Sequence, residues 1–202
     1  MFIERTPSFL RRLYPQAIWR KETDKKTIYL TFDDGPIPEV TPWVLDVLNH
    51  FGIKATFFCV GDNVRKYPAV FERVKAEGHA VGNHTFNHIA GSQWDYETFI
   101  DNVDTAAEYI DSRLFRPPHG HLSFKQYKCL KDRYQIVMWD VITRDYNATL
   151  HPEKVLNIVK KYARNGSLIV FHDSLKAEKN MRYAMPRAVE WLLGERYEFK
   201  TL

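Results

Sequence analysis

Two hydrophobic patterns take turns along this chain. Short apolar runs rich in β-branched residues indicate strands, and longer stretches with apolar residues every three or four positions indicate helices. The seven predicted strands are residues 27–31, 55–60, 80–83, 114–116, 135–139, 167–171 and 197–202. The six predicted helices are residues 41–51, 68–77, 95–112, 124–131, 152–162 and 185–193.

Strands that alternate with helices predict a parallel sheet that is covered on both faces or rolled into a barrel. Residues 27–202 show no linker, repeat or low-complexity segment, so we expect one α/β domain with about seven parallel strands. Residues 1–26 are basic and mixed in character. They are predicted to form an arm or short helix that packs on this domain.

The composition is that of a globular protein. Of 202 residues, 45% are hydrophobic and 27% charged, which excludes disordered and collagen-like classes. The net charge is +4, but no cluster of Lys and Arg is dense enough to indicate a nucleic-acid partner. Cys59 and Cys129 are too few for a disulfide framework and are expected to be buried, reduced thiols.

No apolar run approaches the roughly 18–20 residues that a bilayer-spanning helix needs. Charged residues interrupt the first 21 positions, so the apolar core of a signal peptide is missing. On this basis we expect a cytoplasmic or otherwise soluble monomer without an integral membrane segment.

Polar clusters follow the predicted strands. Asp33 and Asp34 follow the first strand, and the histidine pair His84 and His88 follows the third. Further clusters follow the later strands, at residues 116–120, 140–145 and 172–173. Because the carboxyl ends of parallel strands meet at one edge of a sheet or barrel, these side chains are expected to share one cleft. Alone, the aspartate pair would favour a solvated Asp-Gly turn, and it is the other clusters that reverse this interpretation.

Two histidines four residues apart, joined by a carboxylate from elsewhere, make a three-ligand set that leaves open positions on a divalent cation. His84 and His88 alone are a weak signal, since this spacing also occurs by chance on helices. Glycines at positions 82 and 91 flank the pair and favour a loop. The aspartates and the His172–Asp173 pair at equivalent strand ends strengthen the interpretation.

The chain carries four motifs in order: TFDDGP (31–36), HTFNH (84–88), RPPHG (116–120) and LIVFHD (168–173). In this order they resemble the motifs of the polysaccharide deacetylase family, carbohydrate esterase family four. The resemblance covers residues 27–202. It implies a single-domain distorted (β/α) barrel and metal-dependent removal of acetyl groups from sugars.

The resemblance also implies roles for individual residues. Asp34, His84 and His88 would bind the metal, first of all Zn²⁺, although Co²⁺, Ni²⁺ or Mn²⁺ also suit mixed nitrogen and oxygen donors. Asp33 would be the general base that takes a proton from metal-bound water, whose pKa a bound Zn²⁺ can lower to about 7. His172 would protonate the leaving amine of the sugar.

Two further residues would support this pair of proton-transfer groups. Arg116 would orient Asp33 and keep it ionised. Asp145 would hold the ring of His172 and favour its charged form.

The remaining implied residues would contact the substrate. A backbone N–H near Pro118 and His119 would stabilise the oxyanion together with the metal. Leu168 and Val170 are expected either to line a pocket for the acetyl methyl group or to be ordinary core residues. Tyr146 is expected either to stack on a sugar ring or to pack in the core. His119 stands where many relatives have Tyr, and residues 139–146 depart most from the family pattern.

These roles together predict a metal-dependent hydrolase that removes N-acetyl groups from amino sugars of a polysaccharide or oligosaccharide resembling peptidoglycan or chitin. One alternative is an O-acetyl esterase that acts on an acetylated polysaccharide. A second alternative is a catalytically silent protein that binds a glycan or a metal. The second is disfavoured because such a protein need not keep Asp33 and His172, which bind no metal in this scheme. The missing export signal conflicts with a cell-wall substrate.

Overall fold

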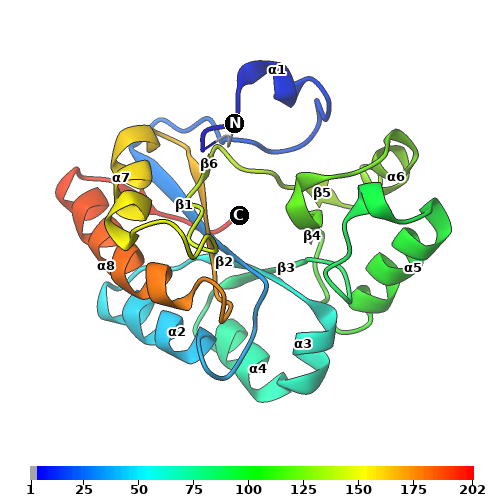
Figure 1. Ribbon diagram of the computed structural model, residues 1–202, viewed down its shortest axis with the longest axis horizontal. Helices are drawn as coiled ribbons and strands as arrows, with labels where there is room; N and C mark the ends of the chain where they lie inside the picture. Colours follow the sequence, from blue (N-terminus) through cyan, green and yellow to red (C-terminus); the bar gives the residue numbers. More distant parts are fainter. Residues whose placement is uncertain (1–3) are drawn as a thin grey trace.

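The computed structural model describes residues 4–202, apart from the side chains of Ser8 and Leu10. Helices lie around the outside of a curled sheet (Figure 1). The elements in chain order are α1 (Ser8–Arg11), β1 (Thr27–Asp33), α2 (Thr41–His50), β2 (Thr56–Cys59), α3 (Gly61–Lys66), α4 (Pro68–Ala76), β3 (Ala80–Asn83), η1 (Gly91–Gln93), α5 (Tyr96–Ala107), β4 (Leu114–Phe115), η2 (Pro118–Gly120), α6 (Phe124–Leu130), β5 (Gln135–Ile136), β6 (Val141–Ile142), α7 (Pro152–Tyr162), β7 (Leu168–His172), α8 (Glu178–Gly194) and β8 (Glu198–Phe199).

The sheet is parallel and has the strand order β5-β4-β3-β2-β1-β7-β6, with β8 paired to the start of β1. All residues of the central strands β1 and β7 are buried, as expected for parallel strands that are covered on both faces. The sheet curls into a half-barrel whose two edge strands are β5 and β6. The prediction of a distorted (β/α) barrel with about seven parallel strands is confirmed.

The N-terminal segment, residues 4–26, bridges the open side of this half-barrel. Ile18 forms a parallel bridge with Val137, just after β5, and Arg5 forms an antiparallel bridge with Val141 in β6. The buried carboxylate of Asp140 accepts hydrogen bonds from an arginine of this segment and from an arginine that precedes β7. We call residues 4–26 the N-terminal arm.

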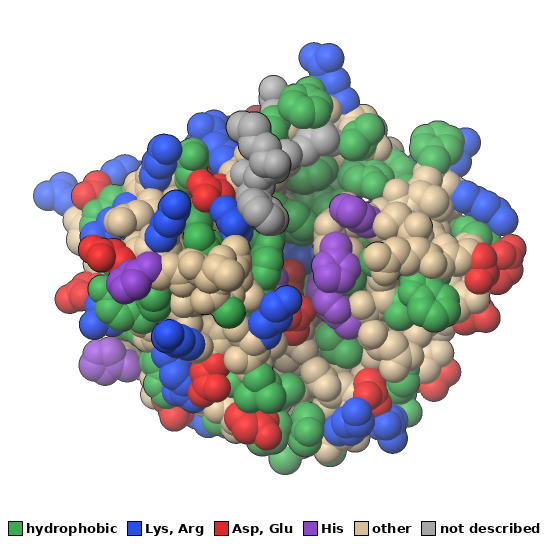
Figure 2. Space-filling model, viewed as in Figure 1, with side chains coloured by type: hydrophobic (Ala, Val, Ile, Leu, Met, Phe, Trp, Pro, Cys, Tyr) green, Lys and Arg blue, Asp and Glu red, His purple; other side chains and the backbone are tan. Residues whose placement is uncertain are grey.

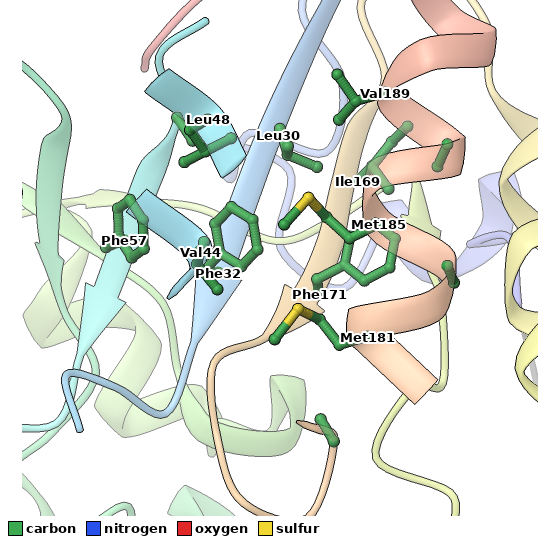
Figure 3. Packing of buried hydrophobic residues seen from close by; sticks show 14 of the residues in the cluster. Leu30, Phe32, Val44, Leu48, Phe57, Ile169, Phe171, Met181, Met185 and Val189 are labelled. Carbon is green, nitrogen blue, oxygen red and sulfur yellow. The ribbon is translucent and has the colours of Figure 1, made fainter. Parts of the chain in front are cut away.

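The main core lies between the outer face of the sheet and the helices α2, α7 and α8 (Figure 3). Phe32 stacks on Phe57 and Phe171, with ring centroids 5.0 and 6.3 Å apart. Because successive side chains of a strand point to opposite faces, Thr31 and Asp33 then face the inside of the half-barrel. The core therefore fixes which carboxylate of the aspartate pair is aimed inward.

Several element boundaries differ from the predictions. Helix α3 was not predicted, because Val64 is the one buried apolar side chain in its six residues. Helix α8 begins at Glu178 rather than at residue 185, since Met181 and Ala184 continue its buried stripe. The two-residue strand β6 was not predicted, and the predicted strands 135–139 and 197–202 shorten to two residues each. Helix α5 ends at Ala107 instead of residue 112.

Within residues 4–202, no helix combines the length and the apolar character that crossing a membrane requires. Both cysteines are free, and Cys59 is buried in β2 while Cys129 is half-buried in α6.

Candidate active site

The ion pair between Asp33 and Arg116 lies inside the half-barrel. Arg116 Nη1 is 2.6 Å from Asp33 Oδ1, and Arg116 is completely buried. The guanidinium also donates to Thr31 Oγ1 and to two backbone carbonyls after β5, and its Cζ atom lies 4.1 Å from the ring centroid of Phe58. Burial lowers the pKa of Arg116, and the charge of Asp33 opposes this effect. A buried arginine with so many partners holds Asp33 in one orientation.

Asp34 turns away from the strand and faces two histidines. Its φ of 83° places it in the left-handed region, and its carbonyl oxygen accepts a hydrogen bond from Asn63. Asp34 Oδ1 lies 3.2 Å from Nε2 of His88 and 3.9 Å from Nε2 of His84. Burial would raise the pKa of Asp34, but the nearby imidazoles lower it well below its usual range. Asp34 is therefore an anion that faces two ring nitrogens.

The loop His84–His88, which we call the metal loop, is shaped by asparagine side chains. Asn83 Oδ1 accepts the N–H of Thr85, and Asn102 Oδ1 accepts two further backbone N–H groups of the loop. His84 Nδ1 lies 2.7 Å from the carbonyl oxygen of Arg116. Because a carbonyl can only accept, Nδ1 donates there, and Nε2 keeps a free lone pair.

The three residues Asp34, His84 and His88 fit a divalent cation. One ligand atom from each lies within 4.8 Å of the other two. Burial lowers the pKa of His84 to about 4, so its ring is neutral near pH 7 and can ligate. Two imidazole nitrogens and one carboxylate oxygen are a donor set that zinc takes in catalytic sites.

On the other side of the pocket, His172 is paired with Asp145. Their side chains approach to 2.7 Å between His172 Nδ1 and Asp145 Oδ1, and Asp145 Oδ2 accepts the backbone N–H of His172. Asn180 donates to the Asp145 carbonyl, and the ring of Tyr146 meets the imidazole edge-on. Burial would lower the pKa of His172, but the hydrogen bond and charge of Asp145, with the charges of Asp34 and Asp33, raise it to about 9.

These side chains share one pocket because of strand register. Asp33 and His172 are direct partners across β1 and β7, at the carboxyl ends of both strands. The pocket at these strand ends has a volume of about 730 Å³. Figure 2 shows histidine side chains along one edge of the hollow at the centre of this face. Its lining residues are Asp33, Asp34, His84, His88, His119, His121, Trp139, Ile142, Arg144, Tyr146, His172, Ser174 and Lys176.

The sequence-predicted substrate residues fall into two groups. Tyr146 and His119 line the pocket, and His119 has a left-handed φ of 58°. Leu168 and Val170 are completely buried and lie outside the lining of this pocket, as does the buried Pro118. Of the two expectations for Leu168 and Val170, their positions fit the core role. The apolar wall of the catalytic pocket comes instead from strand β6 and the residues on either side of it.

Asp173 is a site residue to which the sequence assigned no role. It is buried, and its carboxylate accepts hydrogen bonds from the Gly35 N–H and from Thr41 Oγ1. Its own N–H donates to the Asp33 carbonyl. Burial raises the pKa of Asp173 to about 8. Asp173 therefore holds the turn that carries Asp33 and Asp34. Its position directly after His172 is the sequence feature that could have identified it as a site residue.

Comparisons with known proteins agree with this geometry. A family model described as polysaccharide deacetylase matches residues 20–133. A peptidoglycan-N-acetylglucosamine deacetylase of Bacillus cereus is 33% identical over 192 residues, which is 91% of this chain and 90% of the relative. A chitooligosaccharide deacetylase of Azorhizobium caulinodans is 36% identical over 160 residues, or 74% of this chain and 75% of the relative.

Among solved structures, the Bc1960 peptidoglycan N-acetylglucosamine deacetylase in complex with 4-naphthalen-1-yl-N-oxidanyl-benzamide superposes with a TM-score of 0.89. It is 29% identical in sequence, and the match covers 98% of this chain and 95% of that one. The likeness thus extends over the whole fold as well as over the motifs. The chain belongs to the polysaccharide deacetylase family.

Proposed function

We propose that this protein is a metal-dependent N-deacetylase that acts on N-acetylglucosamine residues of peptidoglycan or chito-oligosaccharides. The observation that carries the proposal is one pocket lined by Asp33, Asp34, His84, His88 and His172, in which a carboxylate and an imidazole each have a buried, oppositely charged partner. The relatives named above act on N-acetylated amino sugars, and this supports the choice of substrate.

Asp34, His84 and His88 would hold the cation, for which we propose Zn²⁺; Co²⁺, Ni²⁺ and Mn²⁺ suit the same donors. When bound, such a cation supplies a Lewis acid that polarises the acetyl carbonyl and makes a water easier to deprotonate. The pairing of Nδ1 of His84 with a backbone carbonyl would keep Nε2 directed at the cation.

Asp33 is the proposed general base. It would accept a proton from the attacking water, whose oxygen forms the new bond to the acetyl carbon. Arg116 binds Oδ1 of Asp33, so Oδ2 is the oxygen that would take this proton. The backbone N–H of His119 is the proposed donor to the oxygen of the acetyl group as negative charge develops there.

His172 is the proposed general acid. Because its pKa is raised to about 9, the ring carries a proton at neutral pH. Asp145 binds Nδ1, so Nε2 would give its proton to the sugar nitrogen as the bond between carbon and nitrogen breaks. The products are acetate and the free amine.

Acetate release tests the proposal. Purified protein with added Zn²⁺ or Co²⁺ should release acetate from N-acetylglucosamine oligosaccharides or peptidoglycan fragments. The variant Asp33→Asn should release none, while its zinc content by elemental analysis stays at the wild-type level. Faster release from acetylxylan than from N-acetylated oligosaccharides would instead favour an O-acetyl esterase, and glycan binding without acetate release under any divalent cation would favour a silent binding protein.

A further inference from the structure

A second hollow, of about 320 Å³, adjoins the catalytic pocket. Three residues line both spaces: His119, His121 and Trp139. The second hollow continues from this shared wall toward the N-terminal arm. Its other lining residues among those described are Thr6, Leu13, Tyr14, Trp19, Ser92, Gly120, Leu122 and Met138.

The aromatic walls of this hollow are held in place by contacts among its own lining residues. Tyr14 Oη donates to the carbonyl oxygen of Leu122 at 2.7 Å and accepts the N–H of the same residue at 3.1 Å. Trp19 lies nearly parallel to Tyr14, with ring centroids 6.5 Å apart, and its indole N–H donates to the Tyr14 carbonyl. These bonds connect the arm to the loop after η2, so both rings are positioned before any ligand arrives.

The shared wall is also fixed. Gly120 has a φ of 70°, and a Cβ at this position would lie 2.6 Å from the indole ring of Trp139. The backbone of Gly120 therefore packs directly against Trp139. This contact keeps the tryptophan between the two spaces, where a ligand that occupies the catalytic pocket can extend along it.

The chemistry of the lining favours an uncharged ligand with apolar faces and hydroxyl groups. None of the described lining residues is Asp, Glu, Lys or Arg. Ser92 Oγ lies 3.2 Å from His121 Nδ1, and both side chains are exposed to solvent, so they can exchange this contact for a ligand hydroxyl. A hollow near 300 Å³ with aromatic walls and a few polar groups is typical of small-ligand sites.

We propose that this hollow, which we call the arm subsite, binds the sugar residue next to the one that is deacetylated. The inference rests on the proposed function, because it assigns a neighbouring residue of the same glycan chain. Continuity through Trp139 and the two histidines is the reason for choosing this occupant: a glycan that enters the catalytic pocket must continue along one of its open sides. The N-terminal arm would then take part in selecting longer substrates.

The experiment compares substrates of increasing length. With zinc added, kcat and KM are measured on N-acetylglucosamine itself and on its oligomers from the dimer to the hexamer. The variant Trp19→Ala should raise KM for the dimer and the longer oligomers roughly tenfold, change kcat less than about twofold, and leave the monosaccharide unaffected, since lost ground-state binding appears in KM. Ser92→Trp, which fills the hollow without removing a core side chain, should give the same dependence on length.

The matched control is Trp94→Ala, because Trp94 is exposed and lies outside both linings. It should behave as the wild type at every length. If wild-type protein releases acetate but Trp19→Ala and Ser92→Trp match the control at every length, the arm subsite is wrong and the proposed function stands. If no oligomer yields acetate, the proposed function fails, and calorimetric binding of the hexamer to the same variants still decides the subsite.

Discussion

Replacing Asp145 with Asn is the sharpest test of the proposed acid. The carboxylate is completely buried, and it binds both Nδ1 and the backbone N–H of His172, at 2.7 and 2.8 Å. Burial alone would lower the pKa of His172, yet it is raised from 6.5 to about 9, with Asp145 the largest opposing influence. The variant keeps the burial and removes this negative charge.

The size of the effect follows from that rise. A rise from 6.5 to about 9 in the pKa of His172 is equivalent to roughly 3–4 kcal/mol. We expect Asp145→Asn to return the pKa of His172 toward 6.5 or below, a fall of at least about one unit. The acid must be protonated, so activity is lost as pH rises through this pKa. The alkaline limb of the rate profile should move from near pH 9 toward pH 7.

The same linkage acts on stability. Because the folded-state pKa of His172 is raised, its protonated form stabilises the wild-type fold fully below about pH 6.5 and progressively less as pH rises through about 9. We expect the free energy of unfolding to lose at most about 3–4 kcal/mol from this source over that window. In Asp145→Asn this slope should largely disappear.

Two measurements check the prediction. The pKa of His172 is read from the NMR titration of its ring protons, assigned with a His172→Gln variant, and acetate release is followed from pH 6 to 10. Asp132→Asn removes an exposed carboxylate and serves as the control for net charge. A His172 pKa and an alkaline limb that both stay near 9 in Asp145→Asn would refute this account of the acid.

Other variants test the supporting structure. Arg116→Met leaves the Asp33 carboxylate buried without its partner and should cost about 3–5 kcal/mol of unfolding free energy in urea titrations. Gly35→Ala places a Cβ 1.9 Å from a carboxylate oxygen of Asp173, so the urea concentration at the unfolding midpoint should fall. Gly194→Ala is the control, because its Cβ meets no atom within 4 Å and should not destabilise the fold. Asn102→Ala removes the acceptor for two N–H groups of the metal loop and should weaken zinc binding about 10–100-fold by calorimetry. Chelation should abolish acetate release, and added zinc should restore it.

The fold was predictable from the sequence where hydrophobic patterns are long. Buried runs such as 167–171 and the helix that begins at Pro152 correspond to β7 and α7 to within a residue. The pattern makes β5 and β8 too long and misses β6. It also misses α3, whose first residues donate hydrogen bonds to the metal loop. Such elements are set by their neighbours in space, which a local pattern does not contain.

The site was predictable to the extent that its residues follow strand ends. Asp33, Asp34, His84, His88 and His172 were expected in one cleft, and the structure brings them together. The apolar wall was not predictable in the same way. It comes from strand β6 and the residues on either side of it, where short segments carry no periodicity.

Strand register raises a difficulty that the buried partners resolve. Asp33 and His172 are direct neighbours across β1 and β7, so without other partners the two would pair with each other, and neither would be free for its proposed proton transfer. Arg116 binds Oδ1 of Asp33 and Asp145 binds Nδ1 of His172, and both partners are completely buried, where solvent screens them little. Buried ion pairs add little to stability by themselves. In the proposed mechanism their value lies in keeping a carboxylate and an imidazolium separate in one pocket at the same pH, each with one atom left for the reaction.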